Sequence, residues 1–196
     1  MIIICTVLTL SSCKGPISDE MAKEIVIPIL ERETELNTYV YGDAFKTKED
    51  PKDDVNSLYS KYYEVDKNGK YTSIDALKKE ISEIYTFETV EVVNIYAFNG
   101  YSDSTDGGAS ITPRFAQSND GVLQIDVTKE PYEMRGVIHT ESIKVLRSTN
   151  KMMKIRVKYS RFSSEGKETV VEKDLILMNE EGIWKLNTQT FAVKCK

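Results

Sequence analysis

The chain has 196 residues, with 26 basic and 31 acidic side chains and a formal net charge of −5. This balance argues against a nucleic-acid partner, because proteins that bind nucleic acids present a clustered excess of Lys and Arg. The length suffices for one hydrophobic core of ordinary size.

The first residues have the pattern of an export signal. An apolar run over residues 2–10 is too short to cross a bilayer as a helix, and it leads into Leu10-Ser11-Ser12-Cys13. Such a run ending in small residues is typical of a secretory signal, and the cysteine after it resembles the bacterial lipobox, in which the thiol receives diacylglycerol. We expect residues 1–12 to be a signal peptide, Cys13 the lipid attachment site in a tether over 13–18, and 19–196 a single domain.

Two observations bear on this interpretation. No Lys or Arg precedes Ile2, so the charged n-region is missing, and a buried first strand with an ordinary cysteine is the alternative. Loss of the signal would leave Cys195 as the remaining thiol, and an exported protein without a disulfide framework fits a Gram-positive surface. We therefore expect a lipid-anchored protein on the extracellular face of the cytoplasmic membrane, with Cys195 frayed or partly packed.

Helical spacing is found before residue 100. Ser18 or Asp19 can cap a first helix that ends near Gly42, with a kink at Pro28. The capping box at 72–75 starts a second helix, with Ile74, Leu77, Ile81 and Ile84 on one face. Thr86 caps a weaker third helix over 87–98, with Phe87, Val90 and Val93 at helical spacing.

Turns and loops separate the remaining elements. Residues 47–54 form a charged linker, 60–65 a short strand, and 66–69 a turn. Residues 114–117 and 122–127 form a hairpin across Asp120-Gly121. The Gly- and Ser-rich stretch 99–112 predicts a flexible surface loop, with a recognition loop as the alternative.

The last third, 137–193, has the pattern of a three-stranded antiparallel meander around which the chain is organised. Residues 151–162 alternate apolar and charged side chains, and a turn at 163–167 leads into a second run over 168–178. Folding the runs about this turn pairs residues whose numbers sum to about 330, and a one-residue slip would pair charges with apolar groups. The expected pairs are Arg156 with Asp174, Lys158 with Glu172, Ile155 with Leu175, and Met153 with Leu177.

A second hairpin is predicted at 179–182, with a return strand over 183–193. We expect Trp184 to meet Leu177 and Leu186 to meet Leu175. Trp184, the single tryptophan, is interpreted as a core anchor, because aromatic side chains bury large areas; stacking on a ligand is the alternative.

Patterns for catalysis and metal binding are missing. His139 is the single histidine, no Gly-x-Ser-x-Gly elbow occurs, and no zinc-ligand spacing surrounds it. Asp66 and Asn68 match the first and third positions of a calcium-binding loop, but the twelfth position, which requires Glu, is occupied by Leu77. We predict no catalytic residue, no metal site and no cofactor.

Three blocks of residues resemble a known family. They are Glu35-Leu36-Asn37-x-x-x-Tyr41-Gly42, then Tyr63-x-Val65 followed by Tyr71-x-Ser73-Ile74-Asp75-x-Leu77, and Glu181-Gly182-x-Trp184-Lys185-Leu186. Over most of residues 19–191 they resemble lipoproteins of clostridia and related Firmicutes, which are similar to NTF2-like (cystatin-like) domains and the IseA type of cell-wall DL-endopeptidase inhibitor. The resemblance implies an α+β fold with N-terminal helices packed against a curved antiparallel sheet, in agreement with the order of the predicted elements.

The functional hypotheses follow from this likeness. The first is a non-catalytic binding module at the cell surface for a cell-wall protein, a peptidoglycan fragment or a small ligand, with inhibition of a cell-wall hydrolase as its sharpest form. The second is a structural or sensing domain. The third is an enzyme with an NTF2-like pocket, for which His139, Tyr159 and Asp174 are the candidate acids or bases.

Overall fold

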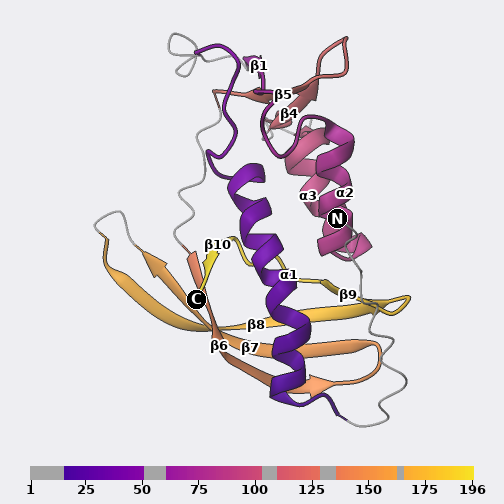
Figure 1. Ribbon diagram of the computed structural model, residues 1–196, viewed down its shortest axis with the longest axis vertical. Coiled ribbons are helices and arrows are strands. Elements are labelled where there is room, and N and C mark those ends of the chain that lie inside the picture. Colours follow the sequence, from indigo (N-terminus) through magenta and orange to yellow (C-terminus); the bar gives the residue numbers. More distant parts are fainter. Residues whose placement is uncertain (1–15, 51–60, 103–109, 129–135, 163–165) are drawn as a thin grey trace, which may run out of the picture.

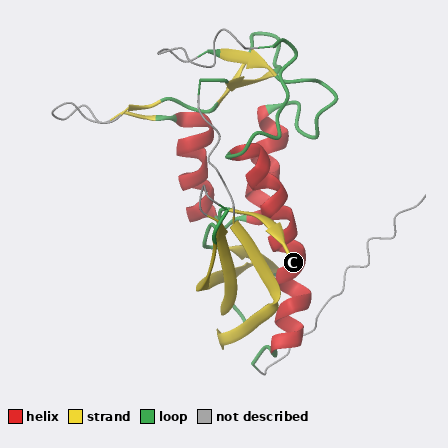
Figure 2. Ribbon diagram, turned by 90° about the vertical axis from the view of Figure 1, so that its left-hand side faces the viewer, coloured by secondary structure: helices red, strands yellow, loops and turns green. Residues whose placement is uncertain are grey.

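The computed structural model describes residues 16–50, 61–102, 110–128, 136–162 and 166–196, and one long helix crosses most of this structure. Helix α1 (Asp19–Val40) lies along a curled five-stranded sheet and continues beyond it (Figure 1). Two shorter helices, α2 (Ile74–Ile84) and α3 (Phe87–Asn94), lie beside its upper half, below a small second sheet (Figure 2). The predicted signal peptide and Cys13 lie outside the described residues.

Helix α1 begins and ends where the sequence predicts. Ser18 Oγ accepts a hydrogen bond from the Met21 amide at 3.2 Å, and Asp19 and Glu20 occupy the first turn, where the helix dipole favours acidic groups. The helix continues unbroken through Pro28. The buried stripe of the helix faces the sheet and consists of Ala22, Val26, Leu30, Glu33, Asn37 and Val40.

The large sheet has the strand order β10-β6-β7-β8-β9. Strands β6 (Gly136–Ser148), β7 (Met152–Phe162) and β8 (Glu168–Glu180) form an antiparallel meander. The predicted register of β7 and β8 is confirmed, because Arg156 is opposite Asp174 and Met153 opposite Leu177. One face of this pair is therefore apolar and faces α1, and the other carries the charges.

The predicted register of the second hairpin is wrong by two residues. Strand β9 (Ile183–Leu186) pairs Leu186 with Leu177 and Trp184 with Asn179. The loop has two residues, because Glu181 (φ 54°) and Gly182 (φ 91°) both adopt the left-handed conformation of a type I′ turn. A two-residue shift keeps each side chain on its predicted face, and Trp184 is half-buried against the core.

The return strand is also shorter than predicted. Strand β9 ends at Leu186, and after a connection over 187–191 the chain forms β10 (Ala192–Cys195), which runs parallel to β6. The large sheet is therefore mixed rather than antiparallel throughout, and Cys195 is a strand residue rather than part of a frayed tail. Closing the sheet edge with β10 brings the chain end against α1, whose side chains fill the concave face.

The upper layer contains both short helices and the hairpin in their predicted places. Ser73 caps α2, and β4 (Phe115–Gln117) pairs with β5 (Leu123–Asp126), with β1 (Tyr62–Glu64) on the other side of β5. After α3 the chain forms a π-helical turn, η1 (Ile95–Asn99). Within the predicted loop 99–112, β2 (Tyr101–Ser102) pairs with β3 (Ser110–Ile111), and 103–109 lie outside the described residues. The α+β architecture of helices on a strongly curled sheet is of the NTF2-like (cystatin-like) type.

Two substitutions in the β8–β9 turn should change the unfolding free energy in opposite directions. Replacing Gly182 by alanine meets no atom within 4 Å, so the cost comes from φ alone, about 1–2 kcal/mol of unfolding free energy. Glu181→Asn should stabilise, by up to ~1 kcal/mol, because asparagine tolerates the left-handed region. Urea unfolding midpoints measure both changes, and a stable Gly182→Ala variant would contradict the type I′ turn.

Candidate functional site

The concave face of the large sheet is where an NTF2-like domain would hold a pocket, and here α1 occupies it. Val26 and Leu30 are fully buried between α1 and the sheet, together with Met153, Ile155 and Leu175. Glu33 interrupts this apolar contact, because its carboxylate is equally buried.

Three donors surround the carboxylate of Glu33. Oε1 accepts from the Tyr85 hydroxyl and the Thr190 amide, both at 2.8 Å, and Oε2 accepts from Thr190 Oγ1 at 2.6 Å. Burial raises the pKa of Glu33, and the hydrogen bonds from Thr190 and Tyr85 oppose that shift. Desolvation outweighs the donors because a buried carboxylate loses its hydration.

Thr190 belongs to the connection between β9 and β10, residues 187–191. Two further side chains, Lys173 and Asn37, bind the backbone at or next to this connection. The Lys173 ammonium donates to the carbonyls of Gln189 (3.1 Å) and Thr190 (3.0 Å), and it lies 5.3 Å from the centre of the Tyr159 ring. Burial lowers the pKa of Lys173, while the charge of Glu33 opposes the shift. Asn37 Nδ2 donates to the Ala192 carbonyl at 2.9 Å. The cluster therefore fastens the β9–β10 connection to α1.

This cluster is poorly suited to acid–base catalysis on a dissolved substrate. A general base must reach the proton that it removes, but Glu33 is fully buried and both of its oxygens accept hydrogen bonds from the protein. Sequence analysis missed Glu33, although an acidic residue at helical spacing from Val26 and Leu30 is a signal for a buried carboxylate.

The structure does not bring His139, Tyr159 and Asp174 together. Tyr159 lies on the inner face, whereas Asp174 lies on the outer face, 2.7 Å from Arg156 Nε and 2.8 Å from Lys154 Nζ. Arg156 and then Lys154 hold the pKa of Asp174 well below its usual range. His139 Nε2 lies 2.7 Å from the Ser160 hydroxyl, which itself donates to Glu168. Each of the three side chains thus has a local partner.

Cysteine and metal chemistry receive little support in the described part of the chain. Burial raises the pKa of the Cys195 thiol to about 11, so the reactive thiolate is scarce at neutral pH. The described residues contain no group of three or more His, Cys, Asp or Glu side chains placed to hold a metal ion. None of the described helices is long and apolar enough to span a membrane.

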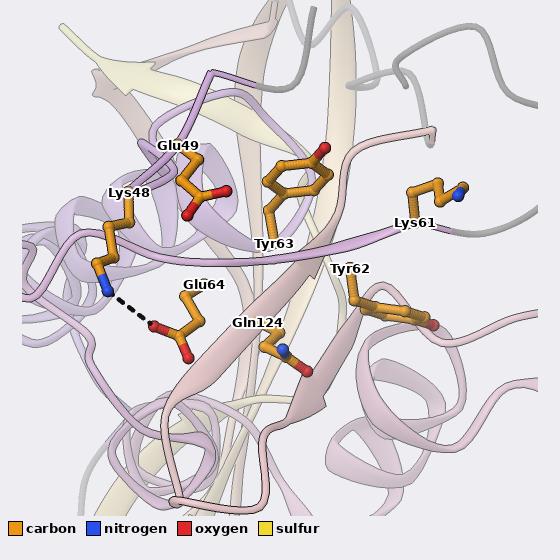
Figure 3. Close-up of a pocket in the computed structure, with 7 residues that line it drawn as sticks. All are labelled: Lys48, Glu49, Lys61, Tyr62, Tyr63, Glu64 and Gln124. Carbon is orange, nitrogen blue, oxygen red and sulfur yellow. Dashed lines mark ion pairs between the residues drawn. The ribbon is translucent and has the colours of Figure 1, made fainter. Parts of the chain in front are cut away.

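A groove of about 450 Å³ lies beside the small sheet. Tyr62 and Tyr63 point to opposite sides of β1, and Lys48 is paired with Glu64 at 3.7 Å (Figure 3). The Tyr62 hydroxyl donates to the Pro113 carbonyl at 2.6 Å, so its polar end is already used. The other lining residues are Glu49, Lys61 and Gln124. The groove offers mixed charges and aromatic surface rather than a set of convergent catalytic groups.

Apolar side chains are exposed on α3 and at the tip of the β8–β9 hairpin. Phe87 is 72% exposed at the first position of α3, against the expectation that it lies on a buried helical face. Val92 is 59% exposed on α3, Ile95 is 42% exposed at the start of η1 directly after it, and Ile183 is 60% exposed at the hairpin. We call these four residues the α3 surface. No pattern in the sequence distinguished them from core residues.

Comparison with the models of known protein families gives no match, and comparison with curated proteins gives none. The resemblance to Firmicutes lipoproteins and to the IseA type of inhibitor therefore stays a prediction from the quoted motifs.

Two replacements of Glu33 separate its hydrogen bonds from its charge. Glu33→Gln can keep an acceptor for the Thr190 amide and a donor for its hydroxyl, so it should fold, whereas Glu33→Leu leaves buried donors unsatisfied and should cost about 2–5 kcal/mol. Because folding raises the pKa of Glu33, its contribution to stability is greatest below the unfolded pKa and is lost as the pH rises through the folded pKa.

The measurement is urea unfolding of wild type and both variants at several pH values from mildly acidic to neutral. Wild type should lose stability relative to Glu33→Gln over that interval. Equal pH dependence of the two proteins would contradict a raised pKa, and an unchanged Glu33→Leu variant would contradict the fastening role.

Proposed function

We propose that the chain is a cell-surface lipoprotein, anchored through Cys13, whose folded body is a non-catalytic binding module for a protein of the cell envelope. In its sharpest form the module modulates or inhibits a cell-wall hydrolase. The observation that supports it best is the filling of the concave face by α1 and the Glu33 cluster, which leaves exposed surface as the place for recognition.

Two further features favour a partner of protein nature. The α3 surface exposes Phe87 and Ile183, which both neighbour Glu180, and exposed apolar patches mark interaction sites. The candidate acids and bases are held in local contacts, so an enzyme is the less favoured function. The inhibitor role is an analogy with the IseA type, since fold does not imply function.

A small-ligand or sensing module is the second candidate. The groove beside β1 supports it, because its volume of about 450 Å³ lies in the range of small-molecule sites and it is bordered by Tyr62 and Tyr63. Its lysines and glutamates suit a polar ligand that carries groups of both charges, as a muropeptide does. Saturation-transfer NMR with muropeptides would detect such binding.

The anchor predicts a lipid-dependent location. Cys13→Ser in the full chain, expressed in a Firmicutes host, should move the protein from the membrane fraction to the medium and abolish labelling with an alkyne fatty acid. A single acyl chain binds membranes reversibly while two chains hold stably, so diacylglycerol accounts for retention. Labelling that persists in Cys13→Ser would place the lipid elsewhere, and an unlabelled cytosolic wild type would contradict the anchor.

The binding role predicts a partner in the envelope. The soluble chain from residue 14 on contains all described helices and strands, and it should retain a defined protein from a clostridial cell-wall extract and slow a purified DL-endopeptidase in a dose-dependent assay. The same protein after irreversible heat denaturation serves as the control. Failure to retain any protein and to slow the hydrolase would contradict the proposal.

A further inference from the structure

The α3 surface spans two elements that are distant in sequence but linked to each other in the fold. Tyr85 pairs with Leu186, and the Thr86 amide donates to the Leu186 carbonyl at 2.9 Å, so the start of α3 is held against β9. Glu180 connects the exposed residues, because its Oε1 lies 3.4 Å from the Phe87 amide and it is the cross-strand neighbour of Ile183. In Figure 1 the lower end of the α3 region lies directly above β9.

Acidic side chains are interleaved with these apolar ones. Glu88 and Glu91 share the exposed side of α3 with Phe87, Val92 and Ile95, since residues three and four apart on a helix are neighbours. Neither Glu88 nor Glu91 forms an ion pair with any residue that the structure describes. Glu181 is exposed at the hairpin, and the nearby cation, Lys185, is already paired with Glu180 at 3.2 Å.

The charge decides among the possible occupants. A second copy of this chain would bring the same carboxylates face to face across a two-fold interface, and like charges there are destabilising. The apolar segment 2–10 carries no basic residue to meet the carboxylates. An anionic membrane surface would be repelled for the same reason. A segment with Lys or Arg flanking apolar anchors complements both features at once.

We propose that the α3 surface docks a cationic amphipathic segment of an envelope protein, with apolar anchors seated against Phe87 and Ile183 and with Lys or Arg facing Glu88 and Glu91. This inference rests on the proposed binding function and assigns it a surface and a partner chemistry. Binding through exposed charges weakens with salt, while the apolar anchors set most of the residence time.

Two fluorescent helical peptides of about 18 residues serve as probes, a length at which amphipathic helices form on a partner. One carries Leu on one face and Lys on the other, and its matched counterpart carries Glu in place of Lys. Anisotropy titrations use the soluble chain from residue 14 on. The Leu/Lys peptide should bind, and Phe87→Ser with Ile183→Ser should weaken it at least ~10-fold.

Charge and location are tested by two more variants. Glu88→Lys with Glu91→Lys should weaken the Leu/Lys peptide and flatten its salt dependence. The matched control is Leu146→Ser with Val170→Ser, which removes two exposed apolar side chains elsewhere and should leave binding unchanged. Amide NMR shifts on adding the Leu/Lys peptide should concentrate in α3 and the β8–β9 hairpin.

Several results would overturn the assignment. They are no binding of the Leu/Lys peptide, equal binding of the Leu/Glu peptide, an equal loss in the control variant, or a dimer in sedimentation that Phe87→Ser dissociates. If the cell-wall partner is retained equally by wild type and by the Phe87→Ser, Ile183→Ser variant, this surface is wrong while the binding function stands. If no partner is retained at all, the binding function itself fails.

Discussion

The hydrogen bonds between Glu33 and Thr190 connect the two ends of the described chain. The N-terminal helix supplies the carboxylate, and the connection between the last two strands supplies the amide and hydroxyl that bind it. A buried carboxylate is costly unless its oxygens accept hydrogen bonds. This requirement fixes the position of α1 relative to Thr190 in that connection. Asn37 adds a second contact of the same kind, to the carbonyl of Ala192. The curl of the sheet around α1 depends on this fastening, because it carries the chain from β9 back to β6, where β10 forms.

Closing the sheet in this way has a functional consequence. In a curled sheet the inner face is the natural place for a ligand, and the helix that covers it decides how much room remains. Val26 and Leu30 of α1 are fully buried against this face. Tyr85, at the end of α2, binds Glu33, and Lys173 of β8 binds the Thr190 carbonyl, so both side chains help to cover the buried carboxylate. Stability and pocket formation compete for the same face. In this chain α1 fills the face and stabilises the fold, and the proposed binding site is therefore placed on elements outside it.

Sequence reasoning succeeded where local chemistry determines structure. The β7–β8 register followed from alternation and one turn, because a slip would bury Arg156 and Asp174 opposite apolar residues. The caps Ser18 and Ser73 marked helix starts, because their hydroxyls accept from the first free amides. Where the outcome depends on distant chain segments it failed. The two-residue turn at Glu181 requires a left-handed glutamate that no propensity favours, and the parallel pairing of β10 with β6 joins segments more than fifty residues apart in the printed sequence.

The same division explains why the candidate site was found only in part. Glu33 could have been identified, since it stands in an apolar stripe at helical spacing. Phe87 could not, because its spacing fits a buried face although the folded protein leaves it exposed at the first position of α3. An exposed phenylalanine beside Glu88 and Glu91, which form no ion pair with the described residues, gains nothing in the isolated fold, since burial of the ring would stabilise the monomer by about 1.5–3 kcal/mol. Phe87 is therefore an apolar group that the described fold leaves uncovered, and it is the kind of side chain that the proposed protein partner would bury.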